Sequence, residues 1–268
     1  MRDILNDLSD TLSDTDPVRR AQIKSKRELP GRFYEKVDVD GIDGAFHVRL
    51  DGRTIRTPAR QELRLPTRDL AELVCREWEA QSTQIDPITM PVTRLVNTAL
   101  DGIASDKQAI IEDILRFAGT DLLCYRADSP QALVELQNEL WDPVLDWARS
   151  ALGAHFQQSQ GIMHVEQPRA AVNAIGIHVA SHDSPMALAS LHIFTTLTGS
   201  AILSLAVAKG HLTAEEAWMA AHVDEDWNIS QWGEDAEAAA RRRFRWTEMQ
   251  AADQVLNCLS GKNEGSIA

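Results

Sequence analysis

The sequence predicts an α+β fold, in which a small antiparallel sheet with covering helices is followed by an all-helical C-terminal domain. Between residues 45 and 50 apolar and polar side chains alternate, and Asp51-Gly52 is typical of a two-residue hairpin turn. From Thr67 onward, apolar residues recur at helical spacing. Residues 184–208 contain no Asp, Glu, Lys or Arg, and their apolar side chains fall on every side of a helix. Such a helix must be surrounded by other atoms, which predicts a core helix inside a helical domain.

The same uncharged segment is long enough to cross a membrane. Its many Ser and Thr residues dilute the hydropathy, however, and no cluster of Lys or Arg flanks either end. We therefore expect no membrane insertion.

Composition narrows the class of protein. A chain of 268 residues with 44% hydrophobic and 25% charged residues is typical of a globular protein with one large or two modest domains. The net charge of -13 argues against nucleic-acid binding, which needs a basic surface, and suits a basic or amphipathic partner. Three widely spaced cysteines predict neither a disulfide framework nor a zinc site, and are typical of free thiols in a reducing compartment.

The N-terminus gives an expected location. The first thirty residues contain six acids and no apolar run, which argues against a secretory signal and against a mitochondrial transit peptide. We therefore expect a cytoplasmic protein of a bacterium.

Changes in sequence pattern divide the chain. We place the domain boundary at Ser129-Pro130, because a capping residue followed by proline is typical of a helix start. The predicted parts are a mobile tail (1–28), an α/β N-terminal domain (29–128), a helical C-terminal domain (129–260) and a disordered tail (261–268).

The predicted strands lie early in the chain and pair as a meander with one face open to solvent. They cover 33–39, 45–50, 53–57 and 62–65, with a turn at 41–44. A short apolar run at 122–125 is a candidate for a further strand of this sheet.

The predicted helices begin at capping residues or prolines. In the N-terminal domain, Thr67 begins the first helix, a second follows Pro91, and Ser105 begins the third. A helix from 130 to about 151 opens the C-terminal domain, and Pro143 is expected to kink it.

Four further helices complete the prediction. Thr213 and Glu216 have the spacing of a capping box, which marks the start of an acidic helix. The other three are a helix from Pro168 to about Ser181, the central helix at 184–210 and a last helix from about Glu234 to Leu259.

An acidic segment follows the central helix. Residues 210–240 carry eight acids and no Lys or Arg, together with Trp218, Trp227 and Trp232. Acids beside aromatic side chains can form a binding surface. They can equally form a solvated face with the tryptophans pointing inward, and the sequence favours this second interpretation because Trp is usually buried.

Four arginines follow at once in the run RRRFRW: Arg241, Arg242, Arg243 and Arg245. Cations interleaved with aromatic residues occur in grooves that bind single-stranded nucleic acid. On a helix, however, Phe244 points away from its neighbouring arginines, and the whole chain is acidic. A solvated basic face that pairs with the upstream acids is the favoured interpretation.

Catalytic and metal-binding motifs are scarce. The sequence has no phosphate-binding glycine loop, zinc-protease motif or nucleophile elbow, so we do not expect an enzyme. His178 and His182, spaced four apart on a helix, could hold a metal ion only with a third ligand, and no spacing supports Glu166 in that role. A metal-dependent enzyme that uses this histidine pair is the alternative hypothesis.

Several motifs together resemble one known family, the assembly chaperones of the F-type ATP synthase that bind the alpha subunit of its catalytic head. The family occurs in mitochondria and alphaproteobacteria. The resemblance covers Pro30 to Leu259, in the family's order. The motifs are RFYEKV (32–37), Glu77-Trp78, TDLLCYR (120–126), LVELQNELWDPVLDWA (133–148) and QWG (231–233).

The resemblance implies a small α/β domain followed by a helical domain, and a non-catalytic role. It implies that the protein binds the unassembled alpha subunit and prevents its aggregation until the beta subunit takes its place. No cofactor, metal, nucleic acid or membrane is expected, and the protein is expected to act as a monomer. The implied location is the bacterial cytoplasm, and the mitochondrial matrix for eukaryotic relatives.

The resemblance also implies a site. Glu225 occupies the position at which the family carries an acidic residue tied to activity, and either neighbour, Asp224 or Asp226, could share its task. Trp232 and Glu234 complete the expected partner-binding surface. Trp78 matches a helix tryptophan of the family, which burial explains equally well.

Overall fold

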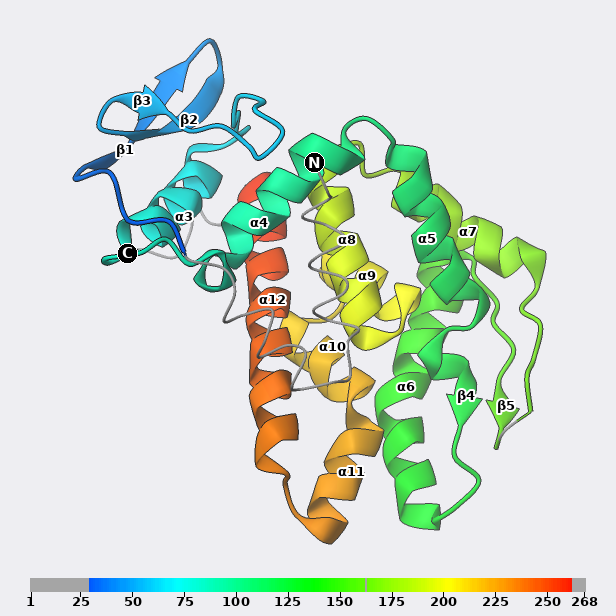
Figure 1. Ribbon diagram of the computed structural model, residues 1–268. Coiled ribbons are helices and arrows are strands. Elements are labelled where there is room, and N and C mark those ends of the chain that lie inside the picture. Colours follow the sequence, from blue (N-terminus) through cyan, green and yellow to red (C-terminus); the bar gives the residue numbers. More distant parts are fainter. Residues whose placement is uncertain (1–28, 162, 262–268) are drawn as a thin grey trace, which may run out of the picture.

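The structure, a computed structural model, describes residues 29–161 and 163–261. A small sheet lies at one end of the molecule and a body of helices makes up the rest (Figure 1). The predicted α+β class is therefore confirmed. The predicted tail at 1–28, and all but the first residue of the one at 261–268, lie outside the described residues.

The N-terminal sheet is a three-stranded antiparallel meander in the order β1-β2-β3. Its strands are β1 (Val37–Ile42), β2 (Ala45–Leu50) and β3 (Arg53–Thr54). The predicted Asp51-Gly52 turn is confirmed, because both residues have the positive φ, 49° and 78°, that such a hairpin requires. The expected solvent-facing side is also present, where Arg49 bonds Asp38 at 2.8 Å and Asp40 at 2.7 Å.

Three strand predictions are wrong. The first strand begins at Val37 rather than at 33 and extends to Ile42, so the predicted turn at 41–44 is reduced to Asp43-Gly44. Residues 33–36 stay outside the sheet because Arg32 and Pro30 bond the backbone at 83–85. Residues 62–65 make only single bridges, to Arg56 and Phe46. The run 122–125 leaves the sheet, as described next.

The segment after residue 121 forms a turn and a separate ribbon. A 3-10 turn, η3 (Leu122–Cys124), is capped by the Asp121 carboxylate. Strand β4 (Tyr125–Arg126) then pairs in parallel with β5 (Ser159–Gln160) rather than with the N-terminal sheet.

The remaining elements are helices and short helical turns. They are α3 (Arg68–Glu79), η1 (Pro87–Thr89), α4 (Pro91–Thr98), η2 (Ala99–Ile103), α5 (Lys107–Gly119), α6 (Gln131–Leu152), α7 (Arg169–Ala180), α8 (Pro185–Thr198), α9 (Ala201–Ala208), α10 (Ala214–Ala221), α11 (Val223–Trp232) and α12 (Ala236–Ser260).

Most predicted helix starts are confirmed. The Thr67 hydroxyl accepts from the Leu70 amide at the start of α3, and Thr213 with Glu216 forms the predicted capping box of α10. The third helix, α5, is capped by Asp106 instead of Ser105, because a carboxylate one residue later reaches the free amides. Helix α6 runs without interruption through Pro143.

The predicted central helix at 184–210 is two helices, not one. Gly199 takes the left-handed conformation (φ 69°) and ends α8, and the Ser200 hydroxyl then caps α9 by accepting from the Leu203 amide at 3.0 Å. The chain turns back, so that α8 and α9 pack against each other. Charge pattern and hydropathy could not show this break, because both halves are equally apolar.

Helix α8 is the centre of the helical body, as its uncharged sequence predicts. It packs against α12, α9, α5 and α4. Most of its residues are buried, including Leu188, Leu191 and Phe194. No helix within the described residues has the length and hydropathy needed to cross a membrane.

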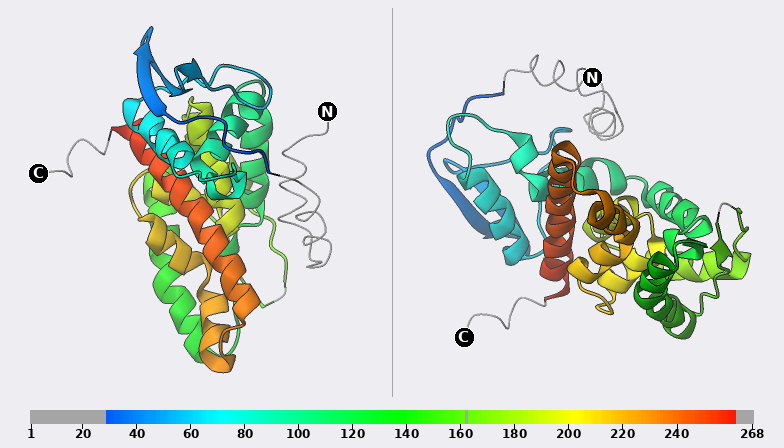
Figure 2. Two further views of the ribbon diagram at one scale, coloured as in Figure 1. Left: turned by 60° about the vertical axis from the view of Figure 1, so that its left-hand side comes forward. Right: turned by 90° about the horizontal axis from the view of Figure 1, so that it is seen from below.

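Helix α12 connects the two ends of the molecule. It packs against α3 and α4 beside the sheet, where Arg94 pairs with Glu248, and its other end continues from α11 (Figure 2). Helices α4 and α5, which precede residue 129, also pack against α8. The domain boundary at residue 129 stays a prediction.

Candidate functional site

Helix α11 and the first turns of α12 form a projection at the end of the molecule that lies away from the sheet (Figure 1). We call residues 223–242 the acidic tip. Gly233 (φ 85°, ψ 170°) ends α11, and the Asp235 carboxylate caps α12 by accepting from the Ala238 amide at 2.8 Å. All five predicted partner-binding residues, namely Asp224, Glu225, Asp226, Trp232 and Glu234, lie on this tip.

The three consecutive acids of α11 have different environments. Asp224 accepts a hydrogen bond of 2.7 Å from the side-chain amide of Gln137 on α6. Asp226 forms an ion pair with Arg242 of α12, and this contact raises the pKa of the guanidinium. Glu225 forms no hydrogen bond or ion pair with any residue that the structure describes. Its charge acts at longer range on Arg242, Arg245 and His222. Glu225 is therefore the one carboxylate of the three that lacks a direct partner within the described part of the chain.

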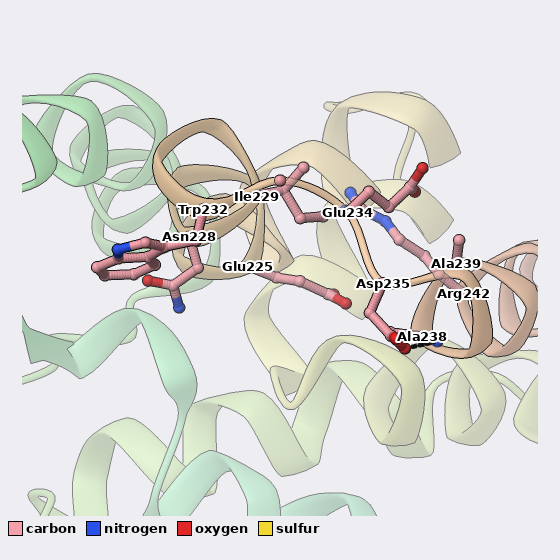
Figure 3. A pocket seen from close by; sticks show the side chains of 10 residues that line it. Glu225, Asn228, Ile229, Trp232, Glu234, Asp235, Ala238, Ala239 and Arg242 are labelled. Carbon is pink, nitrogen blue, oxygen red and sulfur yellow. Dashed lines mark hydrogen bonds between the residues drawn. The ribbon is translucent and has the colours of Figure 1, made fainter.

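Glu225 borders a hollow of about 400 Å³ between α11 and α12. Its carboxylate points toward Asp235 and Arg242, with Ile229 beside them (Figure 3). The residues that line the hollow are Glu225, Asn228, Ile229, Trp232, Gly233, Glu234, Asp235, Ala238, Ala239 and Arg242. The hollow thus has a partly apolar wall and a mainly acidic rim.

The tryptophans of the acidic segment do not all point inward. Trp218 is buried, as predicted. The centre of its ring lies 3.9 Å from the centre of the His222 ring and 5.3 Å from the centre of the Trp246 ring. Trp227 is half-buried. Trp232 is 79% exposed and lines the same hollow as Glu225, so the inward interpretation is wrong for this residue.

Three arginines of the RRRFRW run donate hydrogen bonds to nearby acceptors. Arg241 bonds Glu237 at 2.6 Å, and Arg242 pairs with Asp226, which confirms that these two face acids. Arg245 donates to the Leu197 carbonyl at 2.6 Å and lies over the Trp218 ring. Two of the four arginines are therefore paired with acids and a third is held by a backbone carbonyl, which weakens the argument for a nucleic-acid groove.

The alternative metal site is not supported. Nowhere in 29–161 or 163–261 do three or more His, Cys, Asp or Glu side chains gather closely enough to hold a metal ion. His182 is half-buried, its Nε2 atom has no hydrogen-bond partner, and burial lowers its pKa. Neither His178 nor Glu166 completes a ligand set with it.

Sequence reasoning missed the residues that hold the tip in place. Gln137 is 1% exposed and its carbonyl also accepts from the Ala127 amide at 2.8 Å. The available signal was a polar residue on the face of α6 that also carries Trp141 and Leu145. At the sheet end of the molecule, Glu77 of the EW motif is a second polar residue whose role was not predicted: its carboxylate caps α4 by accepting from the Val92 and Thr93 amides, both at 2.7 Å.

Comparison with known proteins identifies the class. Residues 31–149 match the model of a family described as ATP12 chaperone protein. The chain is 26% identical to the mitochondrial protein atp12 of Schizosaccharomyces pombe over 219 residues, 76% of this chain and 75% of that protein. Among solved structures, it is similar to a putative chaperone from Agrobacterium tumefaciens (55% identity, TM-score 0.84, covering 95% of this chain and 96% of that one).

A second solved structure, Atp12 from Paracoccus denitrificans, is 39% identical with a TM-score of 0.80, covering 85% of this chain and 98% of that one. The fold and these similarities define a chaperone. The chain belongs to the ATP12 chaperone family. The resemblance to the ATP synthase assembly chaperones, drawn from the sequence motifs, is thereby confirmed.

Proposed function

We propose that this chain binds the unassembled alpha subunit of the F-type ATP synthase and prevents its aggregation until the beta subunit joins. On this proposal the role is non-catalytic, needs no cofactor, and is carried out by a monomer in the bacterial cytoplasm. Membership of a chaperone family supports it. The single observation that supports a particular binding surface is the environment of Glu225: its two acidic neighbours already have partners, and Glu225 has none among the residues described.

Physical chemistry gives each part of the tip a task. A subunit without its neighbour exposes an apolar surface, and such surfaces aggregate. An unpaired carboxylate on an acidic projection attracts and orients a basic partner, while an exposed indole supplies apolar contact area. Glu225 and Trp232, which both line the hollow between α11 and α12, provide one of each.

The first experiment reverses the charge of Glu225. We expect Glu225→Lys to fold normally and to weaken capture of the alpha subunit at least about tenfold, because a lysine repels the basic group that the carboxylate attracts. The measurements are capture of purified alpha subunit, suppression of its aggregation, and the melting temperature. The matched control is Glu166→Lys, which makes the same charge change at an exposed residue outside the tip.

A neutral series then separates the three acids. Glu225→Gln should weaken capture more than Asp226→Asn, because the Asp226 carboxylate is already neutralised by Arg242. Unchanged capture by a folded Glu225→Gln and Glu225→Lys would remove this residue from the surface. Failure of the unaltered protein to capture the alpha subunit would overturn the proposed function itself.

A further inference from the structure

Helix α6 reaches the base of the acidic tip with two buried polar side chains, one turn apart. The indole N–H of Trp141, a fully buried residue, donates to the Ala220 carbonyl at 2.7 Å, in the last turn of α10. Gln137 donates from its side-chain amide to Asp224 at 2.7 Å, in the first turn of α11. The α10–α11 junction is therefore fixed to α6 at two points.

Both polar groups of the Gln137 side-chain amide form hydrogen bonds. Its carbonyl oxygen accepts from the Ala127 backbone amide at 2.8 Å, so its NH₂ group must face Asp224. A glutamine carries a donor and an acceptor on one planar group, whereas Glu carries only acceptors and Met offers neither hydrogen bond. The position therefore demands an amide.

Helix α6 is itself held in place by Arg126. The buried guanidinium of Arg126 lies 5.0 Å from the centre of the Trp141 ring. It donates to the Leu123 carbonyl at 3.1 Å, to Asn138 at 3.1 Å and to Asp142 at 2.8 Å. Helix α6 is thereby fixed to the segment that also presents the Ala127 amide to Gln137.

We infer that Gln137 is a positioning residue of the partner-binding tip: its hydrogen bond to Asp224 sets the first turn of α11, and so the direction in which Glu225 points. This inference rests on the proposed function for its link to binding. It assigns Asp224 to orientation rather than to contact with the partner, which separates the roles of the neighbouring acids.

Paired substitutions test the bond. Gln137→Glu places two carboxylates at hydrogen-bond distance, so the first turn of α11 is pushed away. Asp224→Asn keeps the bond, because an asparagine carbonyl can accept from Gln137. In the double variant, Gln137→Glu with Asp224→Asn, the polarity is exchanged: the new carboxylate accepts from the new side-chain amide and still accepts from the Ala127 N–H.

Amide hydrogen exchange and alpha-subunit capture are measured for each variant. In Gln137→Glu we expect amide hydrogen exchange in residues 221–228 to speed up about tenfold, and alpha-subunit capture to weaken by a similar factor. Asp224→Asn alone keeps the hydrogen bond, so its exchange in residues 221–228 should match that of the unaltered protein. The double variant should return to within about twofold of Asp224→Asn in both readouts.

Controls separate positioning from general destabilisation. Leu70→Ala removes core contacts beneath the sheet and should lower the melting temperature while leaving capture and exchange at 221–228 unchanged. If Gln137→Glu does not fold, Gln137→Met, which removes both bonds without adding charge, takes its place.

Normal exchange and capture in a folded Gln137→Glu, or no recovery in the double variant, would overturn the inference. If the unaltered protein does not capture the alpha subunit, the proposed function fails, yet the exchange measurements still decide whether Gln137 positions α11.

Discussion

The α8–α9 pair and the acidic tip are both helical hairpins, yet they treat their polar groups in opposite ways. In α8–α9 buried hydroxyls are satisfied by interior hydrogen bonds: Thr195 donates to the Leu191 carbonyl, and Ser204 donates to the same carbonyl across the pair, both at 2.8 Å. In the tip, the half-buried Glu225 carboxylate has no direct partner in the chain as described, and the Trp232 indole is exposed to solvent. Interior hydrogen bonds make a stable base, and the groups left over at the tip are the ones a partner can use.

The largest expected effect is on stability, and it comes from truncating one aromatic side chain in each of these two regions. Phe194→Ala, at a fully buried position of α8, should lower the free energy of unfolding by about 3–5 kcal/mol. Trp232→Ala removes a larger side chain but should change it by less than about 0.5 kcal/mol, because the indole is exposed. Denaturant unfolding of both variants measures this, and alpha-subunit capture should show the reverse order. Similar losses of stability in the two variants would contradict the contrast.

The second prediction concerns the buried carboxylate at the start of α9. Asp121 is fully buried and accepts from the Leu123 amide at 3.2 Å and from the Ile202 amide at 3.1 Å, and burial raises its pKa to about 6. A raised pKa means that the folded state holds this proton more tightly than the unfolded chain. Protonation therefore adds stability that is complete below pH 3.8 and lost as pH rises through about 6.

The comparison variant is Asp121→Asn, which does not titrate. Relative to it, the unaltered protein should lose about 2.4 kcal/mol of unfolding free energy between pH 4 and pH 7. Urea unfolding of both proteins across this range gives the difference directly. A difference that does not change with pH would show that the two amide donors keep the carboxylate ionised throughout.

The smallest predicted effects come from the glycines that end the two hairpins' first helices. Gly233 has a backbone conformation essentially limited to glycine, so Gly233→Ala should cost about 1–3 kcal/mol and weaken alpha-subunit capture. Gly199 is left-handed, and a Cβ there would meet Leu122 only at 3.8 Å, so Gly199→Ala should cost about 1 kcal/mol and leave capture unchanged. Thermal unfolding and alpha-subunit capture assays compare the two variants in stability and in binding. A greater loss of capture from the Gly199 change would reverse the assignment of the two hairpins.

Sequence reasoning predicted the fold class, most helix starts and the core position of 184–208, because periodicity and capping are local signals. It failed where a long-range contact decides the structure. The split at Gly199 depends partly on Asp121, whose carboxylate bonds the new helix from 81 residues away. The two-residue strand β4 depends on β5, which is equally short and carries no pattern of its own.

The candidate site was predicted as a set of residues but not as a set of roles. Three adjacent acids look equivalent in the chain, and only the positions of Gln137 and Arg242 distinguish them. The exposure of Trp232 was not predictable either, because a tryptophan near the end of a helix gives no local sign of which side the rest of the protein covers.

Helix α12 has a mechanical consequence. Its 25 residues form a rod about 37 Å long, with one end against α3 and α4 and the other at the tip. A rod converts a small angle into a large displacement: a tilt of about 5° at the sheet end would move the far end by about 3 Å, comparable to the length of a hydrogen bond. The packing of α12 against α8 opposes such a tilt, and thereby holds the tip in place relative to the small sheet.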